Sequence, residues 1–211
     1  MMRSRGISRT ALRVSFVILL SSTSALSQDQ APAPVFNDGD VWRFKITNKS
    51  YASSSAALNG IFELIYSQNQ IAVFELADGQ KTELSPYRDR ELLLALFGLS
   101  KVRADLKFPL SVGQKWNYEY KFQAAGISAA QNRSVEVSVA GIEPVNTPAG
   151  SFRAFKLSRE ASWARPGGRS RGGSKAIYYF SAETKSIVKS SEEQDDLLRT
   201  IELTKFGAAP K

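Results

Sequence analysis

The stretch Lys115 to Phe122 reads KWNYEYKF, and it decides the fold class. Its aromatic residues alternate with polar ones, which is the pattern of a β-strand with one buried face and one face in water. A helix would spread the same aromatic residues around its axis. We therefore predict a half-buried strand whose inner face consists of Trp116, Tyr118, Tyr120 and Phe122.

The same alternation recurs on both sides of this strand. Val41 to Thr47 and Ser134 to Val139 also place apolar side chains at every second position. Weaker β patterns occupy Ile71 to Leu76, Phe152 to Leu157, Lys175 to Phe180, Ser186 to Ser191 and Leu197 to Lys205. Turn residues separate them at Asp78-Gly79, Thr147 to Gly150 and Ala182 to Lys185. We predict one all-β domain of antiparallel strands over residues 36–206.

One segment fits two structures. Arg88 to Leu99 (RDRELLLALFGL) has Asp89 and Glu91 near its start and Gly98 near its end, which favours a short helix. Its continuous apolar run also fits a buried strand. Both interpretations stay open, and the chain has at most one short helix.

A faint internal repeat is also present. Phe36 to Ile46 aligns with Leu110 to Tyr120 through a shared Gly-x-x-Trp-x-aromatic pattern. The repeat suggests two related halves, 36–107 and 108–206. The alternative is that any two turn-to-strand junctions look alike.

Three patterns in the second half resemble a known family. They are Phe-Pro-Leu-x-Val-Gly-x-x-Trp-x-Tyr from Phe108, Thr-Pro-Ala-Gly-x-Phe from Thr147 and Tyr-Phe-Ser-x-Glu from Tyr179. In this order they resemble the TapB-like and related exported bacterial β-proteins of unknown function. The resemblance implies a periplasmic, antiparallel β fold with a curved sheet or open barrel, and it transfers no catalytic residues.

Residues 1–27 have the features of a secretory signal. A start that carries four Arg and no acid precedes the apolar run Val14 to Leu20, and small residues at Ala25 and Ser27 suit cleavage after Ser27. The run is far shorter than the ~20 residues of a membrane span. We expect a periplasmic or secreted bacterial protein with no transmembrane segment in the mature chain, and a flexible lead-in at residues 28–35.

Composition narrows the chemistry. The 211 residues include 28 Lys and Arg against 20 Asp and Glu, a net charge of +8, and four of these charges belong to the signal. The chain has no Cys and no His, which excludes thiol nucleophiles, Ser-His-Asp triads and the usual zinc and haem ligands. We expect no enzyme activity, no cofactor and no metal.

Paired carboxylates remain as a catalytic route without His. The candidate pairs are Asp38 with Asp40, Glu192 with Glu193, and Asp195 with Asp196. The simpler interpretation of each pair is a solvated acidic loop. Ser186 and Lys189 have the Ser-x-x-Lys spacing, but in a strand they face opposite ways.

The basic charge is concentrated in one stretch. Arg153 to Lys175 holds seven cations and one acid, Glu160, for a local net charge of +6. Its Gly-rich centre, Ala164 to Ser174, predicts a hairpin tip. Guanidinium groups suit phosphate and carboxylate partners, so we predict binding of an anionic lipid or envelope glycan by Arg165, Arg169, Arg171 and Lys175. The alternative is a solubilising loop, and export argues against nucleic acid.

The aromatic residues carry the leading hypothesis. We predict that Trp42, Trp116, Tyr118, Tyr120 and Tyr178 line a site for an apolar or amphiphilic ligand; the alternative is that they fill a core. The protein would then be a non-catalytic binding module for such a ligand, for an anionic envelope component or for an envelope protein. The rival functions are a carboxylate-driven glycan hydrolase and a purely scaffolding protein.

Overall fold

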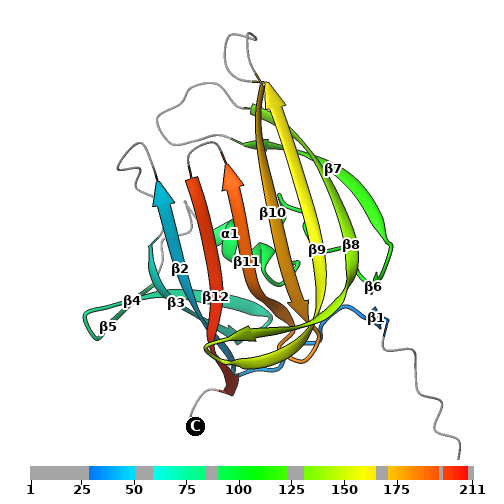
Figure 1. The fold of residues 1–211 in the computed structure, drawn as a ribbon. Coiled ribbons are helices and arrows are strands. Elements are labelled where there is room, and N and C mark those ends of the chain that lie inside the picture. Colours follow the sequence, from blue (N-terminus) through cyan, green and yellow to red (C-terminus); the bar gives the residue numbers. More distant parts are fainter. Residues whose placement is uncertain are drawn as a thin grey trace, which may run out of the picture.

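The computed structural model describes residues 29–50, 59–83, 90–122, 131–164, 171–194 and 197–208. In this part of the chain ten strands form one open, antiparallel sheet in the order β5-β4-β3-β2-β12-β11-β10-β9-β8-β7, confirming the all-β prediction (Figure 1). The strands are β2 (Asp40–Ser50), β3 (Gly60–Ser67), β4 (Gln70–Ala77), β5 (Gln80–Glu83), β7 (Lys115–Phe122), β8 (Gln131–Thr147), β9 (Gly150–Ala164), β10 (Arg171–Ser181), β11 (Ser186–Gln194) and β12 (Leu197–Ala208).

The hairpin of β8 and β9 bends the sheet. These two strands are 17 and 15 residues long, and their register shifts between Val139 and Gly141. Such a bulge adds one residue to one strand and bends it. Beyond the bend, the hairpin tip reaches across the fold, where the Ala149 N–H donates to the Leu203 carbonyl of β12 at 3.2 Å. The sheet is therefore strongly curved at this end (Figure 1).

The curved sheet surrounds the short helix α1 (Arg90–Ala95) (Figure 1). Leu93 and Phe97 from the helix and its C-terminal turn are fully buried in the core. The β11–β12 ladder begins at Lys189, and the Ile187 N–H instead donates to the Leu96 carbonyl at 2.8 Å. The helical alternative for Arg88 to Leu99 is thus correct for the residues described.

The core is well filled around Trp42. Its ring is completely buried and contacts Phe97 edge to face, with 4.8 Å between ring centroids. Its Nε1 donates to the Thr184 carbonyl at 2.6 Å, so the one polar atom of the indole has a partner. This bond links β2 to the turn between β10 and β11.

The two repeated turn-to-strand junctions share their backbone geometry. Gly39 and Gly113 have φ angles of +89° and +85°, which favour glycine. Each donates its N–H at 2.9 Å to the strand paired with the one it precedes, Gly39 to the Tyr66 carbonyl and Gly113 to the Val139 carbonyl. The repeat therefore has a local structural counterpart.

The N-terminal segment differs from its prediction. The strand β1 (Gln30–Ala31) pairs with β6 (Leu110–Ser111), and Ala31 is 1% exposed. The expected flexible lead-in at 28–35 is therefore wrong at these two residues, because Ala31 packs into the core. The predicted signal at residues 1–27 lies outside the described residues. In the described part of the chain, no helix has the length and apolar character needed to cross a membrane.

Candidate functional site

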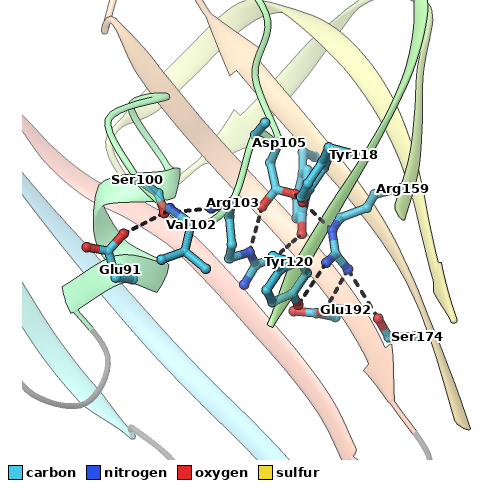
Figure 2. Close-up of polar contacts among 12 residues, drawn as sticks. Glu91, Ser100, Val102, Arg103, Asp105, Tyr118, Tyr120, Arg159, Ser174 and Glu192 are labelled. Atoms are coloured by element: carbon cyan, nitrogen blue, oxygen red, sulfur yellow. Dashed lines mark hydrogen bonds and ion pairs between the residues drawn. The ribbon is translucent and has the colours of Figure 1, made fainter. Parts of the chain in front are cut away.

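The loop after α1 carries charged residues into the concave face of the sheet. The Glu91 carboxylate accepts hydrogen bonds from Ser100 Oγ at 2.6 Å and from the Lys101 N–H at 3.1 Å. Ser100 Oγ in turn accepts from the Arg103 N–H at 2.9 Å (Figure 2). Further along, Trp116 Nε1 donates to the Ala104 carbonyl at 2.7 Å. These bonds fix the positions of Arg103 and Asp105.

Asp105 is the centre of a buried ionic network. It is 1% exposed, and its carboxylate pairs with Arg103 Nε at 2.8 Å and with Arg159 Nε at 2.9 Å. Tyr118 donates its hydroxyl to the same carboxylate. The side chains converge from the loop and from strands β7 and β9 (Figure 2). Sequence-distant segments are therefore joined by charge-assisted hydrogen bonds.

Arg159 extends this network toward β10 and β11. Its side chain is fully buried, and Nη1 donates to Ser174 Oγ at 3.2 Å and to Glu192 Oε1 at 3.3 Å. On the other side, Arg103 Nη2 donates to the Tyr178 hydroxyl at 3.0 Å. Arg103 and Arg159 are thus balanced by Asp105 and Glu192, so the network is close to neutral.

Burial and charge shift the protonation equilibria in this network. Burial alone would raise the pKa of Asp105, but the attraction of Arg103 and Arg159 and the hydrogen bond from Tyr118 outweigh it and lower the pKa. Burial, followed by the charge of Asp105, raises the pKa of Tyr118 and of Tyr178. Asp105 is therefore ionised and both phenols are neutral at pH 7.

A cavity of about 370 Å³ opens beside the network. One wall comes from α1 and its loop, and the others come from the ends of β7, β8, β11 and β12. Apolar and aromatic wall residues are Leu92, Val102, Tyr120, Phe122 and Leu197. Charged wall residues are Glu91, Arg103, Lys121, Arg133, Glu192 and Arg199. The cavity thus combines an apolar surface with an excess of positive charge.

Small residues on the inward face of β9 and β10 accommodate two large side chains of β9. The inward positions include Ala161, Gly172, Ser174 and Ala176, all buried. Arg159 Nη1 donates to Ser174 Oγ, and the Trp163 indole lies against Gly172, where a Cβ atom would approach it to 2.3 Å. The small residues are therefore part of a close-packed interior.

The structure separates the five predicted ligand-binding aromatics. Tyr120 lies in the cavity wall, whereas Trp42, Trp116, Tyr118 and Tyr178 do not line it. Trp42 packs in the core near Phe97, and the other three surround the loop that carries Asp105. A smaller cavity of about 10 Å³ has Tyr178 in its wall. The ligand role of the four remains a prediction.

Of the predicted anion-binding residues, Arg165 and Arg169 lie outside the described residues. Arg171 and Lys175 are exposed on β10, and Lys175 pairs with Glu160 at 3.3 Å. The pairing of Ala164 with Arg171 confirms a β9–β10 hairpin. Anion binding by these residues remains a prediction.

The structure corrects the interpretation of Glu192 as part of a solvated loop. It lies in β11 with an 11% exposed side chain and pairs with Arg159, whereas Glu193 is exposed on the other face. Asp38 and Asp40 are held by the Gln68 N–H and by Lys185. Asp195 and Asp196 are outside the described residues. Alternation explains the difference, because every second residue of β11 faces inward.

Sequence reasoning missed Arg133 and Arg159. Arg159 is counted only as part of the basic stretch Arg153 to Lys175, and Arg133 is not among the predicted site residues, yet the pattern holds a signal for both. Arg133 is an even number of residues from Val135 and Val137 in β8, so it lies on the same face of the strand as they do. Arg159 lies on the same face of β9 as Leu157 for the same reason. A cation on the apolar face of an alternating strand is expected to be buried. Asp105 lies in a loop, where no such pattern exists.

Comparisons with known proteins give distant structural likenesses. No family model matches the chain, and no curated protein is significantly similar to it. A "putative lipoprotein" of Parabacteroides distasonis is 12% identical with a TM-score of 0.44, covering 85% of this chain and 100% of that one. The hypothetical lipoprotein YmcC of Escherichia coli is 12% identical with a TM-score of 0.43, covering 82% and 90%. An exported protein of Bacteroides fragilis with a YmcC-like fold is 15% identical with a TM-score of 0.36, covering 84% and 99%. No conclusion about a ligand or a reaction follows from likenesses this distant.

Proposed function

We propose that this protein is an exported, non-catalytic binding module that holds a small amphiphile in the cavity beside α1. The observation that carries the proposal is the composition of the cavity wall, in which apolar side chains and an excess of cations meet in about 370 Å³. Ligand cavities typically measure about 300–1,000 Å³ and combine apolar walls with a few polar groups. The export signal at residues 1–27 and the resemblance to TapB-like proteins are parts of the same proposal.

Exposed apolar side chains in the cavity wall support contact with the hydrocarbon chain of a ligand. Val102 is 41% exposed and Phe122 is 38% exposed, and both belong to the cavity wall. A hydrocarbon chain that covered these side chains would also leave the water. Each CH₂ group that is buried in this way contributes about 0.8 kcal/mol of favourable free energy to binding. The cations around the wall suit an anionic or strongly polar end group, so an amphiphile matches both halves of the surface.

A thermal-shift experiment tests this function. The protein is expressed from the full 211-residue chain, purified after export and freed of lipid, and its melting temperature is measured with dodecanol and with dodecanoate. Stabilisation by either compound is expected, since a ligand that binds only the folded state raises its stability. Failure of both compounds to change the melting temperature would contradict the proposal and favour the scaffolding alternative.

Val102→Trp gives the matched variant for this experiment. A Trp at this exposed position in the cavity wall should obstruct the cavity with little loss of stability, so the thermal shift should disappear. Leu99→Trp is the control, because Leu99 is 42% exposed on the same loop and does not line the cavity. An unchanged shift in Val102→Trp would place the ligand elsewhere.

A glycan hydrolase is the second candidate, favoured by one observation. Glu91 and Glu192 both line the cavity, as the mechanism of a carboxylate-driven hydrolase requires of its two acids. Both carboxylates accept hydrogen bonds within the protein, from Ser100 and Arg159. Hydrolysis of envelope glycans that is lost in Glu91→Gln and Glu192→Gln would establish the enzyme and overturn the non-catalytic proposal.

A further inference from the structure

Arg133 is a buried cation in the cavity wall. It is 5% exposed and lies on the concave face of β8, opposite Tyr120 of β7 and Trp163 of β9. Its side chain therefore points to the same side of the sheet as Val135 and Val137. A cation in such a position has been removed from water, which is costly unless the charge is compensated.

Two aromatic rings pack against its guanidinium group. The Arg133 Cζ atom lies 4.0 Å from the ring centroid of Phe122 and 4.0 Å from that of Trp163. Cation–π contacts of this kind hold the group in place. The N–H donors of a guanidinium group lie in its plane, and their fork matches a carboxylate or a phosphate.

Gly172 makes this arrangement possible. It lies opposite Trp163 in the β9–β10 ladder, and a Cβ atom at Gly172 would approach Trp163 Nε1 to 2.3 Å. The indole can therefore lie directly over the β10 backbone. The resulting order is β10 backbone, Trp163, Arg133 and Phe122, so a glycine on one strand positions a cation two strands away.

The charge of Arg133 is not matched by a carboxylate in the described part of the chain. Arg103 and Arg159 each pair with Asp105, whereas Arg133 makes two long hydrogen bonds, to Gln194 Oε1 at 3.4 Å and to Gln131 Oε1 at 3.5 Å. Its Nε is buried without any hydrogen-bond partner. A buried donor without a partner is unfavourable. The two terminal nitrogens of Arg133 carry four N–H donors and make only these two long hydrogen bonds, so an oxyanion in the cavity would accept from the donors that remain on them.

We propose that Arg133 binds the oxyanion end group of a single-chain amphiphile, a carboxylate or a phosphate monoester, whose hydrocarbon chain lies in the cavity. This inference rests on the proposed function and names its ligand more closely. Val102, Leu92 and Leu197 provide the apolar wall for the chain, and the Arg133 guanidinium provides the end-group contact.

Competition binding tests the end-group assignment. Displacement of Nile red by dodecanoate, dodecyl phosphate, dodecanol, acetate and inorganic phosphate is measured for the full-length protein purified after export. The wild type is expected to bind the two dodecyl anions about ten- to hundredfold more tightly than dodecanol, as a charge-assisted hydrogen bond predicts. In Arg133→Gln, all three dodecyl compounds should bind with the affinity of dodecanol.

Two further variants keep the test decisive. Lys115→Gln removes one positive charge from an exposed position on β7 and should leave the preference for anions unchanged. Arg133→Lys keeps the charge but loses the planar fork, and it should keep part of the preference. Near-ultraviolet circular dichroism shows whether each variant is folded. If Arg133→Gln does not fold, the binding of Arg133→Lys tests the proposal.

The outcomes separate this inference from the proposed function. Equal affinity of the wild type for dodecanoate and dodecanol, or a full preference for anions in Arg133→Gln, would overturn the role of Arg133 and leave the amphiphile proposal intact. Acetate or phosphate binding as tightly as the dodecyl anions would indicate a free-anion site and overturn the amphiphile assignment. Failure of every dodecyl compound to bind would overturn the proposed function itself.

Discussion

Arg159 Nε donates to Asp105 Oδ1 at 2.9 Å, and this bond joins two buried side chains that lie 54 positions apart in the sequence. Because Arg159 belongs to β9 and Asp105 to the loop after α1, the bond fixes that loop against the sheet. The same loop supplies Arg103 and Val102 to the cavity wall. The ionic network therefore sets the shape of one side of the candidate site.

Asp105→Ala is expected to lower the free energy of unfolding by about 3 kcal/mol or more, because it leaves two buried guanidinium groups without their shared carboxylate. Urea unfolding measures the change. Glu160→Ala removes the exposed pair with Lys175 from the same strand as Arg159, and it should cost less than about 1 kcal/mol. Similar losses in the two variants would contradict a structural role for the buried network.

The ion pairs of Asp105 should also make the stability of the protein depend on pH in acid. The pKa of a free Asp is about 4, and the pKa of Asp105 in the fold is lower. The stabilisation from Asp105 is therefore complete above about pH 4 and decreases as the pH falls toward the folded-state pKa. The stability difference between wild type and Asp105→Asn should shrink in acid. Urea unfolding of both proteins across this range measures it, and a difference independent of pH would refute the prediction.

Tyr118 and Tyr178 should ionise late in an alkaline titration. Burial raises the pKa of both phenols above the usual value of about 10. Their contribution to stability is present below about pH 10 and is lost as the pH rises further, because the unfolded state then releases protons that the folded state keeps. Tyrosinate absorbance should show two of the seven tyrosines ionising only on unfolding. Tyr118→Phe and Tyr178→Phe should each remove one late transition.

Gly172→Ala should disturb the stacking of Trp163 on Arg133. The new Cβ would meet the indole at 2.3 Å, and forcing extra volume into a packed site typically costs about 1–3 kcal/mol. Urea unfolding and tryptophan fluorescence should both report the change. Gly207→Ala in β12 is the control, since a Cβ there meets nothing within 4 Å. Equal behaviour of the two variants would mean that the glycine does not support the stack.

The strands that the sequence predicts best are those with clean alternation. The prediction of a strand over Lys115 to Phe122 matches β7, because one side of that strand is apolar and the other is polar. The predicted burial is wrong for Phe122, which is exposed at the end of the strand. The strand β3 was not predicted, since Phe62, Glu63 and Leu64 are buried in succession and break the alternation. Glu63 is held there by Arg43 and Lys81, which come from other strands. Such pairing depends on sheet register and leaves no local pattern.

The candidate site was only partly predictable for the same reason. Tyr120 followed from the alternation of β7, and the inward parity of Arg133 and Arg159 was present in the sequence. The sequence did not indicate that Arg159 would pair with a carboxylate and that Arg133 would not. Asp105 pairs with Arg159, and no carboxylate in the described residues pairs with Arg133. That difference arises from the path of the loop after α1.

Photo-cross-linking of a dodecanoate analogue with a diazirine near the end of its chain would show where the hydrocarbon chain of the ligand lies. The label is added to the full-length protein purified after export, with and without excess dodecanoate, and the labelled peptides are identified by mass spectrometry. We expect labels on peptides that contain Leu92, Val102 or Leu197, and we expect excess dodecanoate to abolish them. Labels on outward-facing residues such as Ile177, or labels that persist in excess dodecanoate, would contradict this expectation.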